Sequence, residues 1–199
     1  PGYLASFCRE KGWRLVHIST DYVFSGDSKD LYTEEDQPRP INVYGASKWA
    51  GEKAIQQTMN DYLIFRLQWL YGVAGRHFVG TILDLAAKRE MIRVVEDQRG
   101  SPSFVDHMAQ AITVAIAAEA PAGIYHLANM GYTSWYGLCV EMKQILGLNT
   151  RFEPVDSTQF PRPAERPMNS RLDISKFLRL NLVQVPSWQT AIREYLNET

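Results

Sequence analysis

The stretch Leu15-Val16-His17-Ile18-Ser19-Thr20-Asp21 decides the fold, because a short apolar run ends directly in two hydroxyl side chains and a carboxylate. Apolar runs of this length are typical of strands that are buried on both faces of a parallel sheet. The run 62–67, YLIFRL, repeats the pattern after a polar loop over 25–40 and a helix candidate over 43–59. The order strand, helix, strand predicts two parallel strands joined by a crossover helix.

The same alternation continues along the chain. Helices are expected over 3–11, 43–59, 78–89, 105–118, 134–146 and 188–196, and strands over 15–18, 62–67, 92–95 and 123–127. Gly12 and Gly147 are placed to end helices, and Ser134 is placed to begin one. The last fifty residues hold five of the ten prolines, which predicts a smaller and less regular layer. The whole pattern predicts an α/β fold on a parallel sheet, with ligands bound beyond the carboxyl ends of its strands.

The composition argues against several classes of protein. The 199 residues hold 21 Lys and Arg against 22 Asp and Glu, a net charge of −1, so we expect no nucleic acid and no membrane as partner. No apolar run approaches the ~18–20 residues of a membrane span, and the first five residues lack the features of a signal peptide. Cys8 and Cys139 are expected to be buried thiols. We therefore expect a cytoplasmic protein without a metal site.

Three groups of polar residues are expected at the carboxyl ends of the strands. Ser19-Thr20-Asp21 follows the first strand, and Trp69 follows the second. Tyr44 and Lys48 are four residues apart in the helix candidate between them, so their side chains share one face. A nearby ammonium group lowers the pKa of a phenol from about 10 toward neutral pH, which makes the phenol a proton donor. These parts suit hydride transfer between a nicotinamide and a carbonyl, although an exposed amphipathic helix can carry the same spacing.

The residues around these groups resemble the dTDP-4-dehydrorhamnose reductase family of the extended short-chain dehydrogenase/reductase superfamily. The stretch 17–26, HISTDYVFSG, is similar to the family's STDYVFDG block, and 42–48, NVYGASK, is similar to its NxYGxSK catalytic helix. The similarity continues through 51–52, 65–66, 69–72, 97–102 and 123–127, and it ends in 166–172, RPMNSRL, which is similar to the family's RPxNSRL. Two residues depart from the family pattern. Gln68 replaces a small hydroxyl residue, and Ser103 replaces a frequent Thr.

The resemblance implies that the 4-keto group of dTDP-4-dehydro-6-deoxy-L-mannose is reduced to give dTDP-L-rhamnose, with NADPH or NADH. Tyr44 would donate the proton, Lys48 would hold the nicotinamide ribose and lower the pKa of Tyr44, and Thr20 would tune the same tyrosine. Ser19 is expected beside the cofactor, together with Tyr44 and Lys48. The residues expected at the dTDP-sugar are Thr20, Asp21, Trp69, Arg166, Asn169 and Arg171, with the arginines suited to the diphosphate.

The resemblance also implies a division of the chain. Residues 1–72 are expected to form the second half of a Rossmann-type, doubly wound nucleotide-binding domain. Residues 73–199 are expected to form mostly a smaller α/β substrate-binding region, with 104–128 returning to the Rossmann sheet. The family's GxxGxxG turn, which binds the cofactor pyrophosphate, does not occur in the sequence. We therefore expect a partial Rossmann sheet and a chain that is inactive by itself.

Other interpretations use the same residues. One alternative is a regulatory protein on the same fold that resembles the regulatory subunit of methionine adenosyltransferase, and another is a different nucleotide-sugar reductase or epimerase. Retention of Tyr44 and Lys48 favours an enzyme. Some relatives form homodimers through Mg²⁺ and carboxylates, so a homodimer is an open expectation, and nothing in the sequence places a Mg²⁺ site. The histidines at 77, 107 and 126 lack metal-ligand spacing and are expected to be structural.

Overall fold

Three parallel strands form the central sheet of the structure, a computed structural model that describes residues 1–198. Strand β1 (Leu15–Thr20) pairs with β2 (Tyr62–Leu67), and β2 pairs with β7 (Gly123–His126), which gives the order β1-β2-β7. Thr20 stands opposite Leu67 in this register, so the first two strands end at the same level. The residues that follow β1 and β2 are therefore brought together at one edge of the sheet, as predicted.

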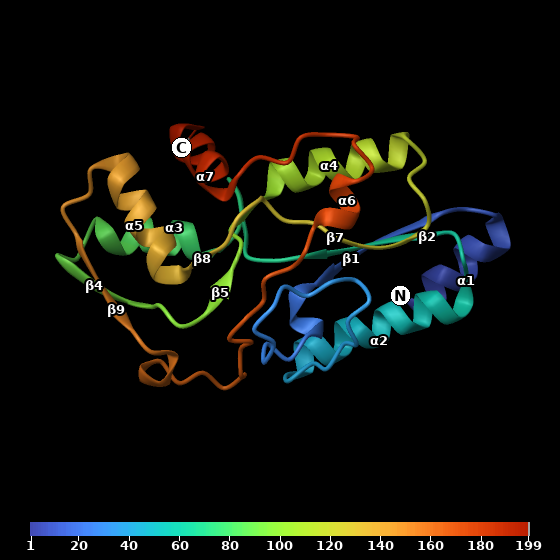
Figure 1. The fold of residues 1–199 in the computed structure, drawn as a ribbon, viewed down its shortest axis with the longest axis horizontal. Helices are drawn as coiled ribbons and strands as arrows, with labels where there is room; N and C mark the ends of the chain where they lie inside the picture. Colours follow the sequence, from blue (N-terminus) through green and yellow to red (C-terminus); the bar gives the residue numbers. More distant parts are fainter. Residues whose placement is uncertain (199) are drawn as a thin grey trace.

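Both faces of this sheet are covered by helices (Figure 1). Leu63, Phe65 and Leu67 of β2 pack in one core cluster with α4 (Val105–Ala117) and α6 (Ser175–Leu178). Ile64 points the other way, into a cluster with α1 (Gly2–Lys11) and α2 (Val43–Thr58). Successive side chains of a strand alternate between its faces, so an apolar run is needed where both faces are buried. The predicted α/β fold with a doubly wound parallel sheet is confirmed.

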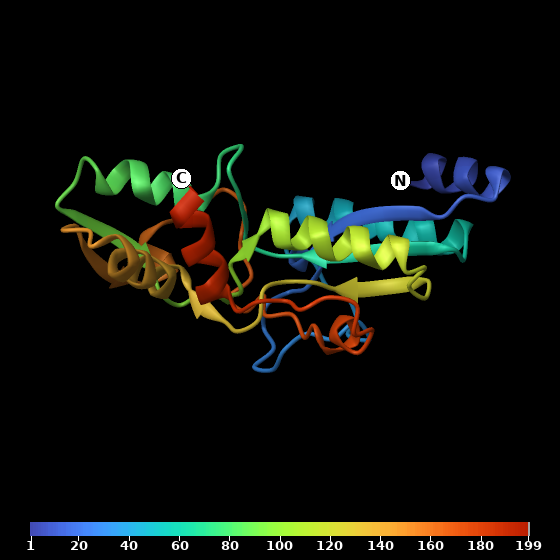
Figure 2. The ribbon, with the colours of Figure 1, turned by 90° about the horizontal axis from the view of Figure 1, so that it is seen from above.

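A second region lies beside the first along the longest axis of the molecule (Figure 2). Its strands β4 (Met91–Val95) and β9 (Arg151–Val155) pair in parallel. Helices α3 (Phe78–Ala86), α5 (Trp135–Leu146) and α7 (Trp188–Glu198) share one apolar core with these strands. Short ladders connect this region to the rest of the chain: β3 (Leu70–Tyr71) with β6 (Ser103–Phe104), and β5 (Arg99–Gly100) with β8 (Thr133–Ser134).

The prediction of a less regular layer over the last fifty residues is partly wrong. Residues 151–155 form the regular strand β9, in register with β4 along its whole length. Pro154 is tolerated because β9 is an edge strand of a two-stranded sheet. Residues 156–174 are irregular, as expected, apart from the 3₁₀ turn Ser157–Gln159 and isolated bridges at Asn169 and Leu172.

Helix ends follow the predicted capping residues. Gly12 and Gly147 end α1 and α5 in the left-handed conformation, with φ of +67° and +63°. The Ser134 hydroxyl accepts a hydrogen bond of 2.9 Å from the backbone N–H of Gly137 and so begins α5. Of the helices in residues 1–198, none is both long and apolar enough to span a bilayer.

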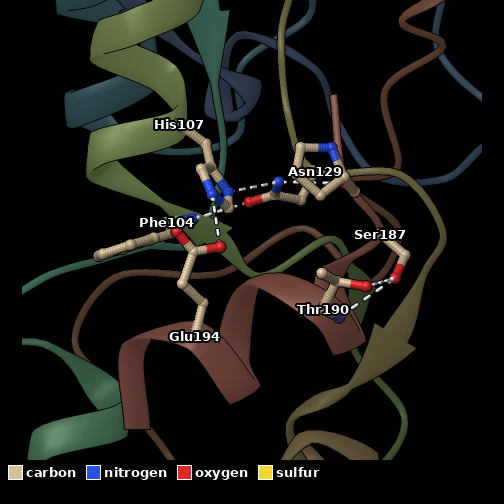
Figure 3. Close-up of polar contacts among 7 residues, drawn as sticks. Phe104, His107, Asn129, Ser187, Thr190 and Glu194 are labelled. Carbon is tan, nitrogen blue, oxygen red and sulfur yellow. Dashed lines mark hydrogen bonds and ion pairs between the residues drawn. The ribbon is translucent and has the colours of Figure 1, made fainter. Parts of the chain in front are cut away.

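Asn129 joins the two regions through its side-chain amide (Figure 3). Its Oδ1 accepts from the backbone N–H of Phe104 at 2.9 Å, and its Nδ2 lies 3.1 Å from both the Pro186 carbonyl and Nδ1 of His107. These partners fix Nδ2 as a donor, so His107 Nδ1 accepts, and the protonated Nε2 donates to Glu194 at 3.1 Å. This chain of bonds ties α4 to α7, which gives His107 the structural part expected of it.

Candidate active site

A cleft of about 580 Å³ lies at the carboxyl ends of β1 and β2, between the two regions. It brings together seven of the nine residues expected at the site, which are Ser19, Thr20, Asp21, Tyr44, Lys48, Trp69 and Arg166. These residues come from four separate segments of the chain. The remaining two, Asn169 and Arg171, are not among the residues that line the cleft.

Helix α2 carries Tyr44 and Lys48 into the cleft from its first two turns. Asn42 begins the helix, because its Oδ1 accepts a 2.8 Å hydrogen bond from the backbone N–H of Gly45. The Lys48 ammonium donates to the carbonyl of Ile18 at 2.8 Å, which ties the helix to β1. Tyr44 is 53% exposed, and its ring meets that of Tyr22 edge-on, so the phenol is accessible from the cleft.

Gly45 allows the start of α2 to press against the chain that follows β1. A Cβ atom at this position would lie 2.0 Å from the carbonyl oxygen of Tyr22. No other residue fits there without moving the backbone, because that oxygen belongs to the main chain. The close approach brings Tyr44 next to the segment 20–22, where Thr20 and Asp21 line the cleft.

Asp21 is a buried carboxyl group at the edge of the cleft, with 2% of its surface exposed. Burial raises the pKa of Asp21 to about 7, and the nearby hydroxyl groups of Thr20 and Ser170 oppose the rise. Its Oδ1 accepts from the Thr20 hydroxyl at 2.9 Å. Its Oδ2 is buried and has no hydrogen-bond partner among the described residues. Near neutral pH this group can therefore donate or accept one further hydrogen bond.

Beneath the cleft, Ser19 belongs to a buried charged network. Its hydroxyl donates to Glu52 of α2, and Glu52 forms an ion pair of 2.7 Å with Arg66 of β2. Both charged side chains are at most 2% exposed. Arg66 also contacts His126 of β7, and burial together with the Arg66 charge lowers the pKa of His126 to about 3. Ser19 lines the cleft, but its hydroxyl is engaged with α2.

Trp69 stands on the other side of the cleft in an unusual conformation, with a φ of +45°. Its indole ring stacks on that of Trp135, with centroids 3.5 Å apart and an interplanar angle of 7°. A Cβ on Gly100 would lie 2.4 Å from Trp69 Cε2, so only glycine leaves room for the ring. The left-handed backbone is unfavourable for an aromatic residue, and these contacts hold it in place.

An irregular segment over 156–168, here called the strap, supplies arginines to the cleft. Arg162 and Arg166 both line it, together with Arg76 from the loop before α3. The strap is held at its beginning by Asp97, which accepts from the backbone N–H and hydroxyl of Ser157 at 2.9 and 2.8 Å. Sequence reasoning missed Arg162, because a lone arginine in a loop carries no spacing signal.

A second cavity of about 430 Å³ adjoins the cleft. Five residues line both spaces, namely Phe78, Thr81, Trp135, Arg162 and Arg166. Farther in, the second cavity is lined by apolar side chains such as Ile92 and Phe160. Trp135 was also missed, since an aromatic residue at the start of an amphipathic helix usually packs in a core. The cleft therefore continues, past arginines, into a more apolar space.

The structure places Asn169 and Arg171 against the long loop after β1. The Asn169 amide donates to the carbonyls of Ser28 and Asp30, each at 2.8 Å, and its Oδ1 accepts from the Arg171 side chain. Arg171 also donates to the carbonyl of Lys29 at 2.6 Å. These residues fix the loop 28–30. No group of three His, Cys, Asp or Glu side chains within residues 1–198 is arranged to hold a metal ion.

Comparison with known proteins gives consistent results. A family described as the RmlD substrate binding domain matches residues 1–199. The dTDP-4-dehydrorhamnose reductase of Escherichia coli (strain K12) is 40% identical over 205 residues, which cover 98% of this chain and 69% of the relative. A crystal structure of dTDP-4-dehydrorhamnose reductase from Bacillus anthracis in complex with NADP has a TM-score of 0.93 at 39% identity, covering 100% of this chain and 70% of that one. A Streptomyces antibioticus protein named "Probable dTDP-4,6-dihydroxy-2-methyloxan-3-one 4-ketoreductase" is 36% identical over 90% of this chain and 61% of its own.

Proposed function

The chain belongs to the dTDP-4-dehydrorhamnose reductase family, and we propose that it carries the proton donor and sugar-nucleotide site for reducing dTDP-4-dehydro-6-deoxy-L-mannose to dTDP-L-rhamnose. The observation that carries the proposal is one cleft in which Tyr44, Lys48 and Thr20 face Trp69 and the arginines of the strap. An acid/base pair on one side and cations on the other match a keto sugar that is linked to a diphosphate.

In this proposal Tyr44 gives its phenolic proton to the oxygen of the 4-keto group. A bound nicotinamide supplies the hydride to the keto carbon, so the C=O bond becomes a CH–OH group. Lys48 holds the first turns of α2 against β1 through the Ile18 carbonyl and places a positive charge on the same helix face as Tyr44. The Thr20 hydroxyl donates to Asp21 Oδ1 in this structure, and it would turn to donate to the same sugar oxygen when the substrate binds.

Two buried polar atoms support a sugar in this cleft. Asp21 Oδ2 and Gln68 Nε2 have no hydrogen-bond partner among the described residues, although both residues line the cleft and are at most 2% exposed. Buried polar groups without partners are rare in folded proteins. A sugar with several hydroxyl groups would satisfy both, since each hydroxyl can donate and accept.

The diphosphate and nucleoside are assigned to the far side of the cleft. This side holds Arg76, Arg162 and Arg166. Their planar guanidinium groups can each form two parallel hydrogen bonds to phosphate oxygens. The adjoining cavity, with Phe78 and Trp135 at its mouth, suits a thymine ring and deoxyribose. We assign the nicotinamide end to residues 1–72 with 104–128, and the sugar nucleotide mostly to 73–199.

The proposal also covers the nicotinamide cofactor, the cellular location and the oligomeric state. We propose NADPH or NADH as the reductant, a cytoplasmic location and a homodimer as the state to be tested. The residues present fit the nicotinamide end, where Tyr44 and Lys48 line the cleft. The sequence holds no GxxGxxG turn for the pyrophosphate. Turnover assays therefore use the chain with the N-terminal cofactor-binding βα units of the Escherichia coli relative fused before Pro1. This protein is called the fusion below.

A second candidate function is the reduction of a different 4-keto sugar. The Streptomyces antibioticus relative, whose name gives another dTDP-linked keto sugar, is 36% identical to the chain. The chemistry at Tyr44 would be unchanged, and only the contacts around the sugar would differ. Profiling the fusion against both keto sugars separates the two candidates.

Replacing Tyr44 with Phe in the fusion tests the proposal. The change removes the proton donor alone, and such groups contribute about 10²–10⁴-fold to rate. NADPH oxidation with the dTDP-4-keto sugar should fall within that range, while calorimetry should show unchanged dTDP binding. Tyr62→Phe is the control, because Tyr62 lies at the opposite end of β2. A loss of less than 10-fold in the Tyr44 variant would exclude it as the proton donor.

A further inference from the structure

Gln68 is a buried glutamine whose amide is oriented by the backbone. It is 1% exposed, and its Oε1 accepts a 3.0 Å hydrogen bond from the backbone N–H of Ser101. Because a backbone N–H can only donate, the end of the amide that meets Ser101 must be the oxygen. The other end, Nε2, therefore carries two N–H donors, and it has no hydrogen-bond partner among the described residues.

The neighbouring residues fix where this amide stands. Trp69 follows Gln68 directly, and its ring is covered on one face by Trp135. The point where a Gly100 Cβ would stand is 2.4 Å from Trp69 Cε2, and 2.6 and 2.8 Å from Nε1 and Cζ2, the atoms on either side. If this point lay in the plane of the indole ring, outside Cε2, it would be nearer to Nε1 and Cζ2 than to Cε2. It is nearest to Cε2, so it lies above the ring plane. Gly100 therefore covers a ring face, and it is the face opposite to Trp135.

Residues 100 and 101 thus hold residues 68 and 69 as a pair. Gly100 lies under the Trp69 ring, and the Ser101 N–H holds the Gln68 oxygen. The Ser101 hydroxyl in turn donates to the Asn129 carbonyl at the junction between the two regions. With one end of the amide anchored and the next residue clamped, Gln68 cannot turn its NH₂ group to another partner without breaking these contacts.

We infer that Gln68 is a specificity-determining residue whose Nε2 donates a hydrogen bond to one of the oxygen atoms attached to the ring of the bound sugar. The inference rests on the proposed function and names one contact in its sugar site. It explains why a buried donor stands unpaired in a cleft wall, a situation that costs free energy unless a ligand satisfies it. The family pattern has a small hydroxyl residue at this position, and a serine or threonine side chain is too short to place an amide donor there.

Two consequences separate this role from a structural one. A donor to one sugar oxygen discriminates between sugars that have and lack that oxygen, because its absence leaves the buried N–H groups unpaired. A side chain that only fills space affects all sugars by the same factor. The ratio of kcat/KM between two sugars is therefore the quantity that responds to a donor and not to packing.

The test compares the unchanged fusion with Gln68→Leu and Gln68→Glu. Leu removes both ends of the amide, whereas Glu keeps an oxygen for the Ser101 N–H and puts a second oxygen, which only accepts when the carboxyl group is ionised, in place of the NH₂ donor. Each protein is assayed with the dTDP-4-keto sugar and with dTDP-4-keto sugars that each lack one ring hydroxyl. Gln144→Leu is the control, because Gln144 is exposed on α5 and lines neither the cleft nor the adjoining cavity.

Both Gln68 variants should lose about 3- to 10-fold in kcat/KM with the complete sugar, the range of one neutral hydrogen bond. For the deoxy sugar that lacks the oxygen bound by Gln68, kcat/KM of the unchanged fusion should fall by the same factor. The two variants should lose nothing further on this sugar relative to their own kcat/KM with the complete sugar. Equal losses for every sugar, or no loss in either variant, would overturn the inference. If Leu fails to fold in a thermal unfolding assay, Glu decides alone. If the unchanged fusion neither binds nor reduces any dTDP-sugar, the proposed function itself has failed.

Discussion

The two sides of the cleft are built in different ways. On the helix side, formed by residues 19–22 and α2, three separate contacts fix one helix: Gly45 against the Tyr22 carbonyl, Lys48 on the Ile18 carbonyl, and Glu52 between Ser19 and Arg66. On the strap, residues 161–167 have a single recorded hydrogen bond within the described structure. It runs from the Asn42 amide to the Glu165 carbonyl at 2.8 Å.

This difference matches the two tasks assigned to the cleft. Proton transfer depends on the position of one phenol, and misplacement by about 1 Å can cost on the order of 100-fold in rate. The helix that carries Tyr44 is accordingly tied to the sheet at successive turns. A site for a diphosphate must open to admit its ligand, and exposed segments with few hydrogen bonds open at low cost. Two of the three arginines assigned to the diphosphate, Arg162 and Arg166, stand on such a segment.

Breaking the buried ion pair should give the largest effect on the helix side. Arg66→Ala leaves Glu52 buried without a cationic partner, and such a loss costs about 3–5 kcal/mol in the free energy of unfolding. Urea unfolding of the chain measures it. Arg193→Ala is the control, because Arg193 is 56% exposed and its pair with Glu141 should contribute at most about 1 kcal/mol. A loss below 1 kcal/mol for Arg66 would mean that the network does not hold the helix side together.

The pH dependence of stability should come next in size. The pKa of Asp21 is raised to about 7 in the folded protein by burial, from the ordinary 3.8. The folded state thus binds the proton more tightly, so Asp21 lowers stability progressively between about pH 4 and pH 7 and by a constant amount above that. The total is on the order of 4 kcal/mol. Asp21→Asn should flatten the curve of unfolding free energy against pH in this window.

Asp27 serves as the control for Asp21, because its pKa is shifted in the opposite direction. The Ser25 hydroxyl lowers the pKa of Asp27, so ionised Asp27 favours the folded state above its unfolded pKa and loses that contribution as the pH falls. Asp27→Asn should therefore change the curve only at acid pH and in the other direction. An unchanged slope between pH 4 and pH 7 in the Asp21 variant would show that its carboxyl is not kept protonated by burial.

The same contrast explains what could be predicted from the sequence. The strands, the helix ends at Gly12 and Gly147, and the meeting of Thr20 with Tyr44 depend on local patterns and on the rule that parallel strands end at one edge. The family resemblance supplied the roles expected of the remaining residues. The contacts that fix the helix side, such as Gly45 against Tyr22, are long-range, and no local pattern indicates them.

The misses have physical reasons as well. Residues 151–154 alternate polar and apolar side chains, as a strand does, but Pro154 argues against a strand unless the strand lies at an edge. Trp135 resembles a core residue until Trp69 is seen stacked on it. Asn169 and Arg171 were expected at the dTDP-sugar because the segment 166–172 resembles the family's RPxNSRL, and in the structure their partners are the carbonyls of the loop 28–30 and each other.

A methyl group at Gly45 should have a smaller effect than either change above. Gly45→Ala forces the first turn of α2 away from the Tyr22 carbonyl, and overpacking of this kind costs about 1–3 kcal/mol. Urea unfolding measures the cost, and NADPH oxidation by the fusion should fall because Tyr44 moves with the turn. Gly2→Ala is the control, since its Cβ would meet only the Ala54 Cβ at 3.4 Å. Full activity in the Gly45 variant would show that the close approach does not position Tyr44.

The smallest effect should come from the hydrogen bond between Asn42 and Glu165, which joins the two sides of the cleft. The Asn42 amide caps α2 with its oxygen and holds the Glu165 carbonyl with its nitrogen. Asn42→Asp keeps the cap and removes the donor, so the strap is released while the helix is not. We expect a rise of about 2- to 5-fold in KM for the dTDP-sugar, with kcat and the free energy of unfolding unchanged, because one exposed neutral hydrogen bond contributes about 0.5–1 kcal/mol.

Asn42→Ala removes both bonds and should in addition destabilise the chain by about 1 kcal/mol. If Asp and Ala raise KM equally and only Ala loses stability, the strap is held through Asn42 independently of the helix cap. A KM that stays constant in both variants would instead mean that the strap reaches its ligand without this bond, and that the two sides of the cleft act independently.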